Sequence, residues 1–390
     1  MELSTKILAV KSSVTLAIAA KAREMKSQGI DVISLSAGEP DFDTPDFIKE
    51  SAVEALRKGQ TKYTPVSGTL ELRQAICRKL KRDQGLDFSP DQIVVGTGAK
   101  HAIFNVLFAL LNPGDEVLIP SPYWLSYPEM VTVIGGGSVF LPTCESTGFK
   151  ITPAMLEKAI TPKSKVLILN SPSNPTGAVY SREELLALIQ VMKKYPRLLI
   201  LSDEIYEKLI FDGQKHCSIA QLDSEIAKRT IVVNGHSKAY AMTGWRLGYA
   251  ACPDKALAKA VESIQSHSTS NPVSFTQAGG VAALDRGEAE AGKMKDVFEK
   301  RRDLFLSLLE KIDCFTTTKP GGAFYLFVNI KKTGLSAFEV SKRLLEEAHV
   351  AVIPGEPFGS AEHIRLSYAV SEKEIYSAVE RMANCFKQKK

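Results

Sequence analysis

The chain has 390 residues, 44% of them hydrophobic and 24% charged, a length that predicts about two domains. A net charge of +5 without a long block of lysine and arginine indicates no nucleic acid partner. The six cysteines and six histidines are scattered without disulfide or zinc spacing, which predicts reduced thiols in the cytoplasm and no metal site.

The N-terminal part predicts an arm, then a helix and a short strand. Residues 1–12 carry charges and no long apolar core, so we do not interpret them as a secretory signal. A helix at about 14–28 and a strand at about 32–35 lead into a loop at 36–45. No stretch has the run of about 20 apolar residues typical of a membrane span, so we expect no membrane partner.

Short apolar strands alternate with helical patterns through the middle of the chain, which is typical of a sheet buried on both faces. Ligands in such sheets bind beyond the carboxyl ends of the strands. The first five predicted strands end in polar or glycine-rich residues, and we expect these ends to meet in one crevice. The six predicted strands are residues 93–95, 116–119, 166–169, 198–201, 231–233 and 247–251.

The first strand leads into a glycine-rich turn, Gly96-Thr-Gly98-Ala99-Lys100, which opens a helix. The free backbone N–H groups at the start of a helix can hold a phosphate, although such a turn is also common in ordinary packing. Trp124, after the second strand, could lie on a planar ring or simply fill the core. Asn174, after the third strand, lies in a loop whose prolines and glycine could aim its amide at a ring oxygen.

The fourth strand ends in Ser202-Asp203-Glu-Ile-Tyr206, so a carboxylate directly follows an apolar run. A buried carboxylate is costly unless it is paired, and a protonated pyridine nitrogen is a suitable partner. Tyr206 could donate a hydrogen bond to the phenolic oxygen of the same ring. The simpler alternative, an aspartate that caps a helix, fits the apolar strand less well.

The fifth strand leads into the most informative segment, which runs from Ser237 to Arg246. Lys238 lies among small and aromatic residues, and such surroundings favour a neutral, nucleophilic amine. Arg246 and the Ser237 hydroxyl could hold a phosphate. A solvated lysine before an ordinary turn would give the same segment. Together with the other four strand ends, however, it predicts an anchor for pyridoxal phosphate.

After about residue 280 the pattern changes to a charged amphipathic helix, at about 288–311, and then to a closing α+β region. We therefore expect a large domain over residues 45–282. A smaller α+β domain would combine residues 13–44 with residues 283–390, and residues 1–12 would form the arm.

Several motifs, in matching order, resemble those of the class I aminotransferases of pyridoxal-phosphate fold type I, and within them the bacterial aspartate aminotransferases. The resemblance covers residues 13–383, essentially the whole chain. It implies an α/β fold with a large, mostly parallel seven-stranded sheet covered by helices, and a smaller α+β domain. The motifs are residues 36–45 (SAGEPDFDTP), 63–65 (YTP), 171–177 (SPSNPTG), 202–206 (SDEIY), 237–246 (SKAYAMTGWR) and 365–368 (RLSY).

The resemblance implies a role for each matching residue. Lys238 is the implied catalytic residue, which bonds to the cofactor and, once freed, moves a proton. Asp203 is the implied partner of the pyridine nitrogen, and Trp124 the ring stacked on the cofactor. The remaining implied cofactor ligands are Asn174 and Tyr206 at the ring oxygen, and Gly98, Ala99, Lys100, Ser237, Arg246 and the neighbouring subunit's Tyr63 at the phosphate.

Substrate recognition is implied less fully. Arg365 resembles the bidentate clamp for the substrate α-carboxylate, with Gly38, Trp124 and Asn174 beside it. The arginine that binds the distal carboxylate in the best-known members has no counterpart within residues 266–272. In the subgroup resembled, a lysine at the position of Lys100 takes this role, helped by hydroxyls such as those of Ser13 or Thr15. Lys100 could equally serve the phosphate.

The implied reaction is a ping-pong exchange of an amino group between an L-amino acid, first L-aspartate, and 2-oxoglutarate, in a cytoplasmic homodimer. Prephenate or aromatic amino acids are the next substrates in order, because relatives differ in few pocket residues. A lyase or a cyclopropane-forming synthase of the same fold is a second alternative. A regulator built on an aminotransferase-like domain is a third.

Overall fold

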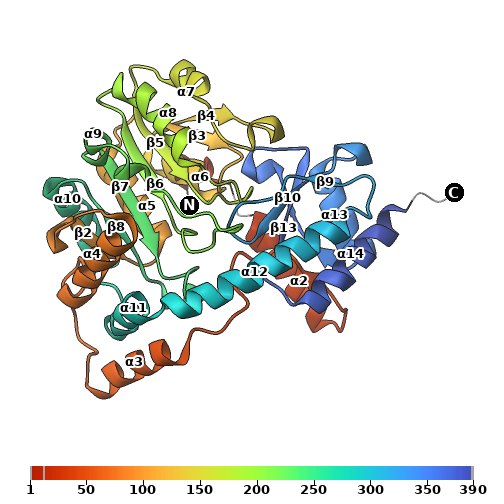
Figure 1. The fold of residues 1–390 in the computed structure, drawn as a ribbon, viewed down its shortest axis with the longest axis horizontal. Helices are drawn as coiled ribbons and strands as arrows, with labels where there is room; N and C mark the ends of the chain where they lie inside the picture. Colours follow the sequence, from red (N-terminus) through yellow and green to blue (C-terminus); the bar gives the residue numbers. More distant parts are fainter. Residues whose placement is uncertain (1, 12–13, 388–390) are drawn as a thin grey trace.

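The computed structural model describes residues 2–11 and 14–387 and is built around a seven-stranded sheet (Figure 1). Its pairing is parallel except at β8, which runs antiparallel to both of its neighbours. In spatial order the strands are β2 (Ile93–Gly96), β8 (Gly248–Ala251), β7 (Thr230–Gly235), β6 (Leu199–Asp203), β5 (Ser164–Asn170), β3 (Glu116–Ser121) and β4 (Gly137–Pro142).

The sheet confirms the expected seven-stranded, mostly parallel architecture and all six strands placed from the sequence. The strand that the sequence did not reveal is β4, which pairs only with β3 and lies at the edge. Its side chains are mostly exposed or half-buried, and Phe140 is 44% exposed. An edge strand of this kind lacks the continuous apolar run that identifies a buried strand.

Helices cover both faces of the sheet, and successive strand residues point to opposite faces. In β5, Val166 and Ile168 pack with α5 (Ala99–Leu110), α6 (Ser126–Ile134) and α10 (Lys255–Ser266). Leu167 and Leu169 pack on the other face. The helices there are α7 (Pro153–Ala159), α8 (Arg182–Lys193), α3 (Asp46–Arg57), α4 (Leu70–Gln84) and α11 (Ser274–Arg286).

A second core lies beside this sheet (Figure 1). Residues near the N-terminus, Ile33 and Leu35, pack there with residues from the last third of the chain. The domain boundaries themselves stay predictions. This part contains an antiparallel sheet in the order β12 (Ile353–Pro354), β13 (His363–Ser367), β10 (Tyr325–Asn329) and β9 (Thr316–Thr317), and the parallel pair β1 (Ile33–Ser34) and β11 (Val350–Ala351).

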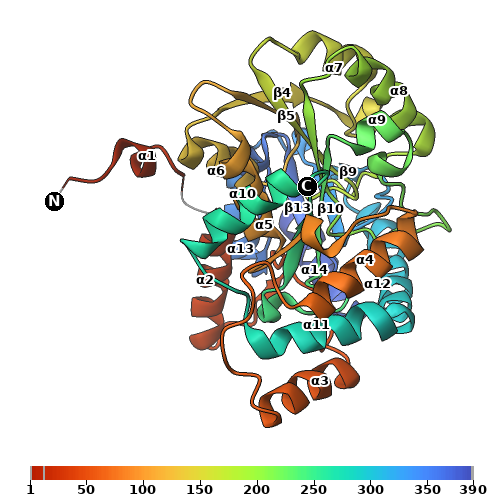
Figure 2. The same cartoon turned by 90° about the vertical axis from the view of Figure 1, so that its left-hand side faces the viewer.

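The helices of this part are long and amphipathic. The predicted helices at 14–28 and 288–311 are confirmed as α2 (Val14–Ser27) and α12 (Glu288–Leu309). Figure 1 shows α12 running from beside α11 to the second core, which it enters with α13 (Ala337–Glu347) and α14 (Glu372–Phe386). Figure 2 shows α1 (Thr5–Leu8) on an arm that projects from the body next to α6. Within the described residues, no helix has the length and hydrophobicity of a membrane span.

Candidate active site

A cavity of about 370 Å³ lies at the carboxyl edge of the seven-stranded sheet, and its size is typical of a small-molecule site. The residues that follow β2, β3, β5, β6 and β7 all contribute to its wall, which confirms that the five strand ends meet in one crevice. Tyr325 and Arg365 of the antiparallel sheet complete it. The predicted residues in the wall are Gly38, Ala99, Lys100, Trp124, Asn174, Asp203, Tyr206, Ser237, Lys238, Arg246 and Arg365.

Lys238 follows the end of β7 and is held inside this cavity. Its Nζ donates a hydrogen bond to the carbonyl oxygen of Gly38, on the loop after β1. Burial is the main cause that lowers the pKa of Lys238 to about 8, and the carboxylate of Glu39 opposes it. An amine with this pKa is partly neutral near physiological pH, so it can act as a nucleophile or a base.

Asp203, the last residue of β6, is 3% exposed and has a donor at each carboxylate oxygen. The hydroxyl of Tyr127 donates to Oδ2 at 2.6 Å, and the backbone N–H of Ile205 donates to Oδ1 at 3.3 Å. Burial raises the pKa of Asp203 to about 6, and the Tyr127 hydrogen bond opposes this shift. The carboxylate is therefore aimed and buried without a positive partner in direct contact.

Tyr127 is a residue of the site that the sequence motifs did not reveal. It lies on α6 one helical turn after Trp124, and the two rings meet edge to face with centroids 5.2 Å apart. The aromatic pair at positions i and i+3 was the available signal.

A second group of residues forms a small polar hollow at the start of α5. Gly98 has φ of +87°, and a Cβ atom there would lie 2.5 Å from Nη2 of Arg246. Arg246 is fixed by hydrogen bonds to the carbonyl oxygens of Thr243, at 2.9 Å, and Thr97, at 3.2 Å. The free N–H groups of the first helical turn and this guanidinium are the donor set that a phosphate requires. A side chain at Gly98 would fill the hollow.

Lys100 lies in the first turn of α5 with its Nζ 4.9 Å from the centroid of the Trp124 ring. Burial, and then the positive charge of Arg246, lowers the pKa of Lys100. Thr15 also lines the cavity, and its buried hydroxyl has no hydrogen-bond partner among the described residues. The other hydroxyl candidate, Ser13, lies outside the described residues.

Arg365, on β13, is 2% exposed, and within the part of the chain that the structure describes it makes hydrogen bonds only to neutral groups. Its Nη1 donates to Oδ1 of Asn174 at 3.0 Å, and its Nη2 donates to the carbonyl oxygen of Ser36 at 2.9 Å. Burial lowers the pKa of Arg365, and no carboxylate of the described chain forms an ion pair with it. A buried guanidinium without a counter-charge is suited to an anionic ligand.

Tyr325 is the second residue that sequence analysis missed. Its hydroxyl lies 2.9 Å from that of Tyr206, and its ring lies 4.4 Å from the guanidinium carbon of Arg365. Burial raises the pKa of both phenols, so both stay protonated near neutral pH. The Gly-Gly-Ala-Phe-Tyr run before β10 was visible in the sequence, but only the fold brings it to Tyr206.

Two predicted residues are not part of the cavity wall: Gly98, which directly precedes Ala99 of the wall, and Tyr63. Tyr63 lies on the loop before α4, is 92% exposed and lines a separate surface depression. Its expected role at a neighbouring subunit's phosphate stays a prediction.

Comparisons with known proteins agree with this geometry. Residues 30–382 match the family model of aminotransferase class I and II. The chain is 48% identical to aspartate aminotransferase from Bacillus subtilis, over 98% of each chain, and 47% identical to a probable aspartate/prephenate aminotransferase from Rickettsia bellii, over 97% of this chain and 98% of that protein. Aspartate aminotransferase from Thermus thermophilus, solved with maleate, superimposes with a TM-score of 0.94 at 43% identity, over 99% of this chain and all of that one. The chain therefore belongs to the class I and II aminotransferases, a family that implies pyridoxal phosphate as cofactor, and the protein is an aminotransferase.

Proposed function

We propose that the enzyme binds pyridoxal phosphate and exchanges an amino group between L-aspartate and 2-oxoglutarate by a ping-pong reaction. The observation that carries this proposal is the pair of cationic side chains in one cavity, Arg365 and Lys100, neither of which has an ion-pair partner among the described residues. A dicarboxylic amino acid supplies one carboxylate for each cation. The relative from Thermus thermophilus was solved with maleate, which is also a dicarboxylate.

The residues of the cavity suit the cofactor. When bound, pyridoxal phosphate supplies an electron-accepting ring that stabilises negative charge at the substrate Cα. Asp203 would face the protonated pyridine nitrogen, since a buried carboxylate gains most from a positive partner. Lys238 would attach to the cofactor, and its released amine would move the proton at Cα.

The rest of the site would position the reactants. Trp124 would lie on the ring, with Asn174 and Tyr206 at its phenolic oxygen, and Arg365 would hold the substrate α-carboxylate beside Gly38. The phosphate would be held by Gly98, Ala99, Ser237 and Arg246, with Lys100 assigned to the distal carboxylate.

We also propose a cytoplasmic homodimer in which each subunit's Tyr63 reaches the phosphate of its neighbour. The support is the position of a large aromatic residue, 92% exposed, on a loop at the surface. A side chain this exposed can reach a second copy of the chain. The cysteines, none of which is paired in a disulfide, suit a reducing compartment.

Prephenate is a second candidate substrate. It combines a 2-oxo acid with a second carboxylate, so it presents the same two anions to Arg365 and Lys100. Apolar side chains of Ile103 and Leu125 in the cavity wall could receive its ring. The relative from Rickettsia bellii carries this substrate in its name.

Half-reactions with single amino donors test the proposal. Aspartate alone should convert bound pyridoxal phosphate to the pyridoxamine form without release of ammonia, and steady ammonia production would identify a lyase instead. Lys100→Met should slow dicarboxylic donors by about 10- to 100-fold, the effect of losing one charged hydrogen bond, and leave alanine unchanged. An equal loss for all donors would assign Lys100 to the phosphate.

A further inference from the structure

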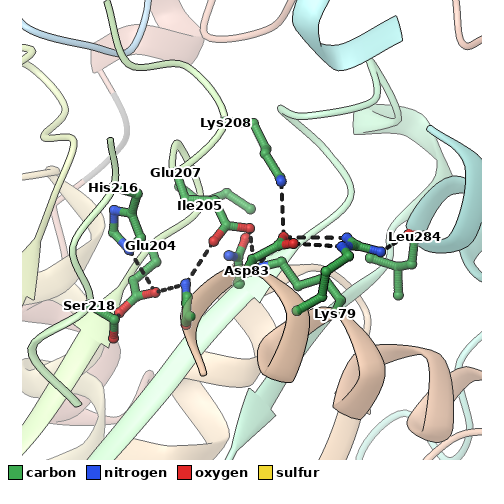
Figure 3. A network of polar contacts seen from close by, with 12 residues as sticks. Lys79, Asp83, Glu204, Ile205, Glu207, Lys208, His216, Ser218 and Leu284 are labelled. Atoms are coloured by element: carbon green, nitrogen blue, oxygen red, sulfur yellow. Dashed lines mark hydrogen bonds and ion pairs between the residues drawn. The ribbon is translucent and has the colours of Figure 1, made fainter. Parts of the chain in front are cut away.

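A buried polar network surrounds Glu204, the residue that follows β6 (Figure 3). It joins the end of β6 to the C-terminal end of α4 and to the loop that contains residues 212–218. Its central group is the carboxylate of Glu204, which is 1% exposed and directly follows Asp203 in the chain.

Four donors surround the Glu204 carboxylate. Oε1 accepts hydrogen bonds from the hydroxyls of Ser202, at 2.8 Å, and Ser218, at 2.6 Å. Oε2 accepts from Nε2 of Gln84 at 2.7 Å and lies 2.9 Å from Nε2 of His216. Burial alone would raise the pKa of Glu204, but these contacts outweigh it and lower the pKa to about 2. Burial alone would lower the pKa of His216, but the Glu204 carboxylate outweighs it and raises that pKa. The Glu204 carboxylate is thus ionised, and each of its two oxygens has two hydrogen-bond partners.

This arrangement clamps the backbone around Asp203. Ser202 and Glu204 point to the same side of the strand because they are two residues apart, and their side chains bond to each other behind Asp203. The Glu204 N–H donates a hydrogen bond to the carbonyl oxygen of Val233 at 2.9 Å, which extends the pairing between β6 and β7. Because Ser202 and Glu204 are fixed on one side of the strand, the Asp203 side chain between them is directed to the opposite side.

The network is not suited to a metal ion. Ligand atoms of Glu204, Glu207 and His216 lie within 4.8 Å of one another, which is close enough for a cation. The amide nitrogen of Gln84, however, already bridges the two carboxylates, at 2.7 Å and 2.8 Å, and the Lys79 ammonium contacts Glu207. The acidic groups Asp83, Glu204, Glu207 and Glu288 are paired with the basic groups Lys79, Arg82 and Lys208 and with His216.

We infer that Glu204, held by Ser202, Ser218, Gln84 and His216, is a positioning residue that aims Asp203 at the pyridine nitrogen of the cofactor. This inference rests on the proposed binding of pyridoxal phosphate. It assigns no contact between Glu204 and the cofactor, so the effect passes through Asp203. Glu204 also raises the pKa of Asp203 as a like charge, and Ser202→Ala, which keeps that charge, separates positioning from this charge effect.

The test compares two substitutions in the same network, Glu204→Gln and Glu207→Gln. Both remove one buried charge of similar shape, but only Glu204 flanks Asp203. Glu204→Gln should weaken pyridoxal phosphate binding to the apoenzyme by about tenfold, the effect of one misdirected charged hydrogen bond, while Glu207→Gln binds it as the wild type does. The pyridine-nitrogen 15N resonance of labelled cofactor should move toward the unprotonated position in Glu204→Gln alone. In the holoenzyme kcat should fall with little change in KM for the donor, because Arg365 is untouched.

Equal cofactor affinity and equal 15N resonance in the two variants would overturn the inference and leave the network a purely structural one. If Glu204→Gln does not fold, Ser202→Ala removes one of the four hydrogen bonds and is read against Glu207→Gln in the same way, with an expected loss of about threefold. Wild-type apoenzyme that binds no pyridoxal phosphate would refute the proposed function instead. The two failures are therefore distinguishable.

Discussion

The hydroxyl of Tyr127 donates a 2.6 Å hydrogen bond to Oδ2 of Asp203, and this bond joins a helix on one face of the sheet to the end of its central strand. Burial and this hydrogen bond have opposing effects on the pKa of Asp203. Burial raises the pKa of Asp203 to about 6, and the Tyr127 hydrogen bond opposes that rise because it stabilises the charged form.

Tyr127→Phe should therefore raise the pKa of Asp203 further above 6. The hydrogen bond to a charged group contributes about 1.5 to 3 kcal/mol, so the acidic limb of pyridoxal phosphate binding should move up by about one to two pH units. Titration of the apoenzyme with the cofactor at a series of pH values measures this limb.

Tyr180→Phe is the matched control for this substitution. Tyr180 is also buried, and its hydroxyl accepts a hydrogen bond from the backbone N–H of Ile151 at 2.9 Å. This variant should lose stability without any movement of the acidic limb. An unmoved limb in Tyr127→Phe would show that the hydroxyl does not control Asp203.

Asp203 is expected to destabilise the apoenzyme. Its pKa of about 6 lies above that of an exposed aspartate, so between about pH 4 and pH 6 the folded protein binds more protons than the unfolded chain. Stability then falls as the pH rises through this window, and the loss is complete above pH 6. Asp203→Asn should raise the free energy of unfolding of the apoenzyme at pH 7 by about 3 kcal/mol, as measured by urea denaturation.

Asp203→Asn should remove the pH dependence of apoenzyme stability described above and should also weaken cofactor binding. The gain from Asp203→Asn should shrink as the pH falls from 6 toward 4, where the wild-type carboxyl is protonated as well. Cofactor binding should weaken at pH 7, since an amide offers the pyridine nitrogen no charge. An apoenzyme that loses stability on this substitution, at every pH, would contradict the assigned burial cost.

How far the sequence predicted this site depends on what brings each residue to it. Asp203 and Lys238 could be placed because each follows a buried strand, and parallel strands end at one edge of the sheet. The pairing of Tyr127 with Asp203 and of Tyr325 with Tyr206 could not be predicted, since each pair forms through packing between separate elements, 76 and 119 residues apart along the chain. No local pattern encodes such a pair.

The strands of the sheet also differ in how well the sequence predicted them. Buried strands such as β5 are visible as apolar runs, whereas the edge strand β4 has polar and apolar positions that read equally well as a loop. Glu204 was part of a recognised motif, but its hydrogen bond from Gln84 crosses 120 residues. The residues that touch the cavity were therefore more predictable than the residues behind it.

Lys238 should react with the cofactor over an unusual pH range. Burial lowers its pKa to about 8, from 10.5 for an exposed lysine, so the neutral amine becomes the main form above pH 8. The rate at which apoenzyme forms the covalent bond to pyridoxal phosphate should rise with pH to a midpoint near 8, as followed by stopped-flow absorbance. Lys238→Ala should bind the cofactor without this phase. A midpoint near 10.5 would mean that the amine is solvated before the cofactor arrives.

Gly98→Ala should act on the phosphate of the cofactor alone. The new Cβ would lie 2.5 Å from Nη2 of Arg246, and φ of +87° is already strained for alanine. The guanidinium must move out of the hollow, so affinity for pyridoxal phosphate should fall by at least about tenfold, the value of one charged hydrogen bond. Pyridoxal, which lacks the phosphate, should bind to the variant as it does to the wild type.

Gly85→Ala separates this contact from backbone strain. Gly85 ends α4 with φ of +68°, and a Cβ atom there meets nothing within 4 Å. Gly85→Ala should lower the free energy of unfolding by about 1 kcal/mol, the cost of alanine at a positive φ. It should leave the affinities for pyridoxal phosphate and for pyridoxal unchanged. Loss of pyridoxal and pyridoxal phosphate affinity to the same extent in Gly98→Ala would place the phosphate elsewhere, because only a displaced Arg246 distinguishes the two ligands.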